Sequence, residues 1–231
     1  MDKQSIDKKD LEKQSAARAA VKFIQQNDIV GLGTGSTAFF AIQEIALLVK
    51  NGLKIKGVPT SEHTASLALS LGIELLPMEE VKSIDITIDG ADEFDTQLNL
   101  VKGGGGALFR EKIVASLTKN EIIIADSGKL VAQLGKFKVP IEVVPLALNY
   151  VVQQLSKLNG KGEVRMKDNS PFITDNHNII VDADFGLISD PAALAESLNR
   201  IEGILAHGLF VQLTSKIIMG KGTETIIYAG N

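Results

Sequence analysis

The chain contains no cysteine and no tryptophan, and aromatic residues make up only 5% of its 231 residues. Without cysteine it forms no disulfide and performs no thiol chemistry, which fits a reducing compartment. It also lacks a run of about 18 apolar residues, the length that a membrane-spanning helix needs. The first 14 residues are polar and have no apolar core like that of a secretory signal. We therefore expect a cytoplasmic protein with no membrane partner.

The chain also has no excess of positive charge: it contains 24 Lys and Arg and 28 Asp and Glu, which gives a formal net charge of −4. This balance argues against nucleic acid as a partner. An anionic ligand must then be held by a local site and not by a general basic field. The length allows one large or two small domains with a substantial core.

Four consecutive glycines, Gly103 to Gly106, are the most informative feature that is present. Glycine lets the backbone adopt positive φ and approach a ligand closely. A flexible linker would have polar flanks, but the flanks here are an apolar strand-like segment, 98–101, and a helical run, 107–117. We interpret the segment as a strand, an anion-binding loop and a helix. A tight loop without a ligand is the alternative.

A second glycine-containing turn, residues 33–37 (GTGST), lies between an expected strand, 27–32, and an expected helix, 38–49. This order aims backbone N–H groups and the helix dipole at a phosphate. The hydroxyls of Thr34, Ser36 and Thr37 would add donors. The turn does not satisfy the dinucleotide or P-loop patterns. It therefore predicts a phosphate site and not a nucleotide site, with an ordinary helix cap as the alternative.

The third feature is an acidic turn, Asp89-Gly90-Ala91-Asp92-Glu93, after an alternating strand at 84–88. Asp89 is expected at the carboxyl end of that strand, where open α/β sheets bind ligands. Paired carboxylates suit acid–base work because one can hold a proton while the other stays charged. A metal site and a simple capping turn are the alternatives, although the calcium-loop spacing is absent.

Strands and helices are expected to alternate through the first half of the chain, which predicts a doubly wound, mostly parallel sheet. After Pro140 the order becomes βαββαβ, a ferredoxin-like unit, and 215–228 is expected to return as strands. The predicted fold class is α/β, with a Rossmann-like domain of residues 1–137 plus 211–231 and a smaller inserted domain of 138–210. The remaining expected strands are 54–58, 121–125, 141–144, 163–166, 179–182 and 203–210, and the remaining expected helices are 11–23, 62–71, 147–158 and 191–201.

In their order along the chain, these motifs closely resemble the type A ribose-5-phosphate isomerases. They are the turn at 31–38, Thr60-Ser61, the acidic turn, the segment from Lys102 to Lys112, and Asp126-Ser127-Gly128-Lys129. The glycine run and the acidic turn are the most specific of them. The resemblance implies an enzyme of the non-oxidative pentose phosphate pathway that interconverts D-ribose 5-phosphate and D-ribulose 5-phosphate through an enediolate. It implies no metal or other cofactor, a small sugar phosphate as the partner, and a homodimer or homotetramer.

The resemblance also implies roles for individual residues. Glu111 would be the base, and Lys102 would stabilise the enediolate oxygen; by composition alone, Glu111 would be one more solvated charge. Asp89 and Asp92 would handle the sugar hydroxyls and assist ring opening. The other residues expected to contact the substrate are Thr34, Gly35, Ser36, Thr37, Gly90, Ala91, Gly103, Gly104, Gly105 and Lys129, with Lys13 as a further candidate. Apart from the resemblance, His63 beside Thr60-Ser61 is a candidate to line a site, but a surface or packing role is the favoured interpretation.

Two other functions stay open from the sequence. A sugar-phosphate-sensing regulatory domain could keep the phosphate turn, but it would not need Glu111 and Lys102 together. It would also usually carry a DNA-reading helix-turn-helix, and only one helix is expected before the first strand. A related enzyme, such as a sugar-phosphate deaminase or lactonase, is the other alternative, and product analysis on ribose 5-phosphate separates them.

Overall fold

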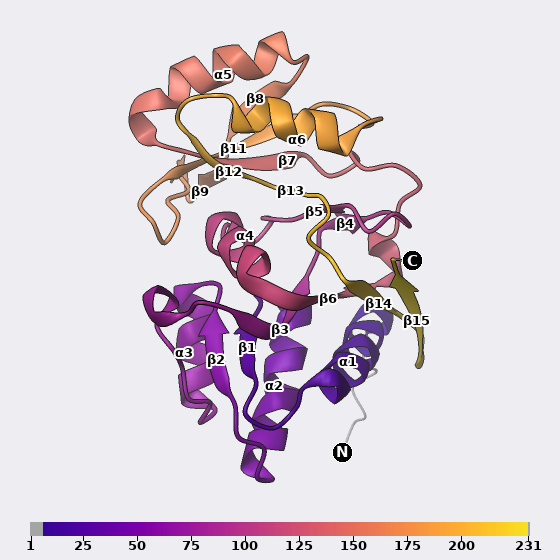
Figure 1. The fold of residues 1–231 in the computed structure, drawn as a ribbon. Helices are drawn as coiled ribbons and strands as arrows, with labels where there is room; N and C mark the ends of the chain where they lie inside the picture. Colours follow the sequence, from indigo (N-terminus) through magenta and orange to yellow (C-terminus); the bar gives the residue numbers. More distant parts are fainter. Residues whose placement is uncertain (1–6, 231) are drawn as a thin grey trace. The chain divides into compact units, whose positions relative to one another are not determined.

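The computed structural model describes residues 7–230, which form two compact units (Figure 1). The first unit contains the described residues up to Gly90, Val114–Leu130, and the described residues from Thr214 onward. The second contains Ala91–Ile113 and Val131–Leu213. No helix in the described part of the chain is long and apolar enough to cross a membrane.

The first unit is built on a six-stranded sheet in the order β15-β14-β6-β3-β1-β2. All neighbouring strands are parallel except β14 and β15. The chain runs from β1 to β2 on one side and then returns to β3 on the other side of β1. This reversal is a topological switch point, and it confirms the predicted doubly wound, mostly parallel sheet. The strands are β1 Ile29–Leu32, β2 Lys56–Pro59, β3 Ile84–Gly90, β6 Thr118–Asp126, β14 Lys216–Lys221 and β15 Glu224–Ala229.

Helices bury aliphatic side chains on both faces of this sheet. On one face, α1 and α2 pack over β-branched residues of the central strands, with Ala17, Ile42 and Ile124 among the buried side chains. On the other face, Val114 of α4 packs with Val58 and Ile84. The helices are α1 Lys8–Ala20, α2 Ser36–Lys50, α3 Glu62–Ser70 and α4 Leu108–Leu117, and the short 3-10 helices are η1 Val21–Phe23, η2 Met78–Glu80 and η3 Ser127–Lys129. The residues of α4 up to Ile113 belong to the second unit, and those from Val114 belong to the first.

The second unit contains an antiparallel four-stranded sheet in the order β12-β7-β11-β8. Its chain order, β7-α5-β8-β11-α6-β12, confirms the predicted ferredoxin-like unit. Helix α6 begins at the predicted residue, Pro191, and the Asp190 side chain caps it by accepting from Ala193 N–H. The elements are η4 Pro145–Ala147, α5 Leu148–Lys157, α6 Pro191–Asn199, β7 Val139–Val143, β8 Lys161–Val164, β9 Met166–Lys167, β10 Ser170–Pro171, β11 Ile179–Asp184 and β12 Ile204–His207.

A small antiparallel sheet explains why the unit boundaries differ from the expected 1–137, 138–210 and 211–231. Strands β4 (Glu93–Phe94), β5 (Leu100–Val101) and β13 (Leu209–Phe210) form this sheet within the second unit. The expected strand at 203–210 is therefore two strands in different sheets. Gly208 lies between them, and its carbonyl accepts from Lys102 N–H. Long-range pairing of this kind leaves no local pattern in so short a strand.

Candidate active site

The first group of candidate residues lies in the first unit, where β1 ends at the switch point of the sheet. Gly33 N–H donates to the Ile88 carbonyl, and Gly35, with φ 110°, immediately precedes α2. Ser36 and Thr37 form the first turn of this 15-residue helix. Helix N–H groups in the first turn lack intrahelical acceptors and carry the positive end of the dipole. The turn therefore has the geometry of a phosphate site.

Asp89 lies next to this turn, at the carboxyl end of β3. Its Oδ1 accepts from Thr34 N–H at 3.0 Å and from Gly90 N–H at 2.7 Å. The side chain is 1% exposed. A Cβ on Gly33 would lie 2.1 Å from the same oxygen, so the close approach of the two strands requires glycine there. The structure thus brings together two motifs, 33–37 and 89–90, that are more than fifty residues apart in sequence.

The Thr34 hydroxyl has a different environment from that expected. It hydrogen bonds within the first unit to Thr60, Ser61 and Thr64, at 2.7, 2.9 and 3.2 Å. Ser61 also caps α3 by accepting from Thr64 N–H. The hydroxyl therefore ties the turn to α3, which leaves Ser36 and Thr37 as the candidate hydroxyl donors of the turn.

A hollow of about 440 Å³ opens beside the same turn. Gly33, Gly35 and Ser36 line it, together with His63 and Thr64 of α3. His63 thus borders this hollow. The remaining lining residues are Asp10, Phe39, Phe40, Ile42 and Leu67.

Lys129 and Lys13 belong to a neighbouring part of the first unit. Lys129 ends η3, and this turn is held by Glu12, whose Oε2 accepts from the Ser127 N–H and hydroxyl. Burial raises the pKa of Glu12, but the hydrogen bonds from Ser127 and Gly222 outweigh it and hold the pKa below its usual value. Lys13 pairs with Asp10 at 3.3 Å. Sequence reasoning missed Glu12, which looks like one more surface charge on an amphipathic helix.

The second group of candidate residues lies in the second unit and centres on Lys102 and Glu111. The ammonium of Lys102, which follows β5, donates to Glu111 Oε1 in the first turn of α4 at 3.3 Å. The side chains are only 2% and 6% exposed. Lys102 Nζ also lies 5.5 Å from the centroid of the Phe210 ring. The structure therefore places a buried carboxylate and a buried cation side by side, which is not a solvated charge run.

The glycine loop between these two residues is a tight turn. Gly106 N–H donates to the Gly103 carbonyl at 3.0 Å, and both residues have positive φ, 97° at Gly103 and 83° at Gly106. Gly104 N–H donates to Asp92 Oδ2 at 2.7 Å. Asp92 thus contacts the loop directly, and Gly104 and Gly105 are exposed.

The acidic turn does not form a metal site among its own residues. Glu93 is occupied: its carboxylate accepts from Gly135 N–H at 2.9 Å and from Phe137 N–H at 2.6 Å. Between residues 7 and 230 no group of three or more His, Asp or Glu side chains is arranged to hold an ion. The carboxylates of Asp89 and Asp92 face backbone N–H groups in their own units.

Glu111 is flanked on α4 by two residues that anchor the helix within the second unit. Arg110 Nε donates to Asn176 Oδ1 at 3.2 Å. Lys112 Nζ donates to the carbonyls of His207 and Leu209 at 2.6 and 3.0 Å, and burial lowers the Lys112 pKa to about 7. Lys112 lies in the matching motif, but no sequence signal identified it as buried.

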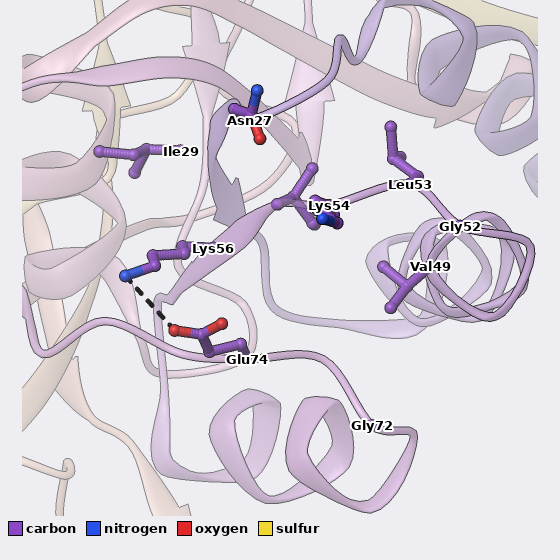
Figure 2. Close-up of a pocket in the computed structure, with 10 residues that line it drawn as sticks. Asn27, Ile29, Val49, Gly52, Leu53, Lys54, Lys56, Gly72 and Glu74 are labelled. Atoms are coloured by element: carbon purple, nitrogen blue, oxygen red, sulfur yellow. Dashed lines mark ion pairs between the residues drawn. The ribbon is translucent and has the colours of Figure 1, made fainter.

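A separate hollow of about 550 Å³ lies at the start of β1 and β2, near Asn27, Ile29 and Lys56 (Figure 2). The Lys56 ammonium points to Glu74 in the figure and pairs with it at 3.3 Å. The predicted site residues of the first unit follow the carboxyl ends of β1 and β3, so this hollow belongs to the other end of the sheet. It contains none of the predicted site residues.

The fold and the two groups of residues define the class of protein. It is an α/β protein whose parallel sheet has a glycine turn and a helix N-terminus at its switch point, and whose glycine loop joins a buried cation to a buried carboxylate. Such a combination suits a small phosphorylated substrate and proton-transfer chemistry.

Comparison with known proteins identifies the family. Residues 56–224 match the family model described as ribose 5-phosphate isomerase A (phosphoriboisomerase A). The chain is 46% identical over 211 residues to ribose-5-phosphate isomerase A of Sphingopyxis alaskensis, covering 91% of this chain and 92% of that one. It is 49% identical over 214 residues to the protein of the same name from Desulfatibacillum aliphaticivorans, covering 91% and 93%. The chain therefore belongs to the ribose 5-phosphate isomerase A family.

Solved structures agree with this assignment. The ribose 5-phosphate isomerase A of Methanocaldococcus jannaschii matches with a TM-score of 0.91 at 37% identity, covering 96% of this chain and 99% of that one. A D-ribose-5-phosphate isomerase in complex with phospho-erythronic acid matches with a TM-score of 0.92 at 39% identity, covering 94% and 97%.

Proposed function

We propose that this chain is an aldose–ketose isomerase that interconverts D-ribose 5-phosphate and D-ribulose 5-phosphate. The observation that carries the proposal is the buried Lys102–Glu111 pair, in a segment that falls within the match to the isomerase family. The relative solved with phospho-erythronic acid adds support, because that acid, like the substrate, bears a phosphate on a hydroxylated carbon chain.

The proposed reaction needs one base and one fixed cation. Glu111 removes the proton from C2 of the open-chain aldose, and the electron pair forms the C1–C2 double bond of an enediolate with its charge on O1. A proton then passes from O2 to O1, and Glu111 returns its proton to C1 to give the ketose. Lys102 stabilises the oxyanion throughout, because a preorganised cation in a buried site needs no solvent reorganisation.

The other predicted residues would bind and orient the substrate. The N–H groups of Ser36 and Thr37 at the start of α2 would hold the phosphate, where the helix dipole favours negative charge. Asp89 and Asp92 would accept from sugar hydroxyls and assist ring opening. The glycine loop would provide backbone donors, and Lys129 a further positive charge.

The test is product analysis on ribose 5-phosphate, comparing the wild type with Glu111→Gln. The amide keeps the shape of the side chain but cannot take up the proton. We expect kcat to fall by about 10²–10⁴-fold, the usual contribution of a general base, with a smaller change in KM. Glu163→Gln is the matched control, because Glu163 is an exposed carboxylate of the same unit that pairs with Lys138. Near-wild-type kcat in Glu111→Gln would overturn the assignment.

We also propose that the chain forms a homodimer or homotetramer and works in the cytoplasm. Several large apolar side chains are exposed, including Leu146 at 97% and Leu187 at 68%, and association between copies would remove such surface from water. Light scattering on the purified protein gives the subunit number, and cell fractionation gives the location.

A further inference from the structure

The Arg165 side chain hydrogen bonds to the glycine loop, although the two are about sixty residues apart in sequence. Its Nη1 donates to the carbonyls of Gly103 and Gly104 at 2.9 and 3.1 Å. The other side of the guanidinium is held by Asp182 of β11, with Nε donating to Oδ2 at 2.9 Å and Nη2 pairing with Oδ1. The planar fork of arginine can make these contacts at once, whereas a lysine ammonium cannot.

These contacts fix the orientation of two peptide groups. In a trans peptide the carbonyl of one residue and the N–H of the next point in opposite directions. The peptide between Gly103 and Gly104 is therefore held at both ends, by Arg165 at its carbonyl and by Asp92 at its N–H. In the next peptide, Arg165 holds the Gly104 carbonyl, so the N–H of the exposed Gly105 points away from the guanidinium.

Without these contacts, the peptide groups between glycines could adopt several orientations, because glycine permits a wide range of φ and ψ. Each alternative orientation lowers the fraction of molecules whose loop is ready to bind a ligand. Phe172 restricts the end of the same loop, since a Cβ on Gly106 would lie 2.5 Å from its ring. The Arg165 guanidinium lies 5.9 Å from the centroid of that ring. One arginine and one aromatic ring of the second unit thus restrict the conformation of the loop.

We propose that Arg165 is a positioning residue for substrate binding: it orients the peptides of the glycine loop so that Gly105 N–H is presented to an oxygen of the bound sugar phosphate. Arg165 acts through the loop and contacts no reacting atom. This proposal rests on the proposed isomerase function and deepens it, because it assigns a role to a residue outside the matching motifs.

The backbone around Arg165 is held independently of its side chain. Arg165 N–H donates to the Ile180 carbonyl, and the Arg165 carbonyl accepts from Phe172 N–H, both at 2.8 Å. Replacement of the side chain is therefore expected to leave the sheet intact. This separation makes substitutions at the position informative about the loop.

The experiment is steady-state kinetics of Arg165→Met, Arg165→Lys and Asp182→Asn on ribose 5-phosphate. We expect Arg165→Met to raise KM by about 10- to 100-fold, the loss expected for hydrogen bonds from a charged group, with kcat within about threefold of the wild type. Arg165→Lys should recover part of this loss, since it restores the charge but not the fork. The pH profile of kcat should stay unchanged, because Glu111 and Lys102 are intact.

The matched control is Lys138→Met, which breaks the exposed pair with Glu163 near Arg165 but contacts neither glycine carbonyl. A merely structural role would lower the folded fraction, and thus apparent kcat, without raising KM. If Arg165→Met does not fold, Asp182→Asn decides: a raised KM supports the proposal and a wild-type KM overturns it. An inactive wild type would refute the proposed function itself, whereas an active wild type with unchanged KM in folded variants refutes only the role of Arg165.

Discussion

The stability of the second unit should depend on pH through His207, which is buried beside Lys112. Its Nε2 lies 3.1 Å from Asn199 Oδ1, and its Nδ1 lies 3.3 Å from Lys112 Nζ. These partners fit a neutral ring with the proton on Nε2 and a lone pair on Nδ1 facing the ammonium. Burial, together with the charge of Lys112, lowers the pKa of His207 to about 3.

The lowered pKa of His207 determines how the stability of the fold changes with pH. Between pH 6.5, the ordinary histidine value, and pH 3, the unfolded chain binds a proton that the folded chain does not, so stability falls as the pH falls through this window. The single-site loss is about 1.4 kcal/mol at pH 5.5 and about 2 kcal/mol at pH 5. His207→Gln removes the titrating ring, so the pH dependence that His207 contributes is absent from the variant.

The measurement is urea denaturation of the wild type and His207→Gln from pH 7.5 to pH 5. The stability of the wild type relative to the variant should fall by the amounts given above. His177→Asn, at an exposed position of the same unit, controls for the mere loss of an imidazole. Parallel pH dependences of the wild type and His207→Gln would refute the conclusion that the folded protein keeps His207 neutral.

Two further predictions concern the phosphate turn. Gly33→Ala should reduce kcat/KM strongly and destabilise the fold by about 1–3 kcal/mol, because its Cβ would lie 2.1 Å from Asp89 Oδ1. Kinetics and thermal denaturation check the two effects, and wild-type values of both would contradict this close approach. Ser36→Ala should cost about 0.5–3 kcal/mol of transition-state stabilisation on ribose 5-phosphate but little on ribose, if the Ser36 hydroxyl binds the phosphate. Rate measurements of both proteins on both sugars test this, and an equal penalty on the two sugars would assign Ser36 to the sugar end or to the fold.

Most of the fold could be predicted because its signals are local. The alternation of strands and helices up to residue 126 and the βαββαβ order after Pro140 are both present in the structure. The three-stranded sheet of β4, β5 and β13 could not be predicted in the same way. Each of these strands has two residues, and β13 pairs with a strand more than a hundred residues earlier. Such short strands have no periodicity, and only their long-range partner defines them.

The same distinction between local sequence signals and long-range contacts applies to the residues of the candidate site. Glu111 and Lys102 were expected from the resemblance, but their burial depends on the folded structure, which places the Phe210 ring near Lys102; residue types alone do not encode this. Arg165 and His207 have no local signal at all, since their partners are Gly103 and Lys112, about sixty and ninety-five residues away. A sequence motif identifies residues that contact a substrate, because the substrate constrains both their chemical type and their spacing. Residues that orient those groups from another strand are constrained only by the folded geometry, so only a structure reveals them.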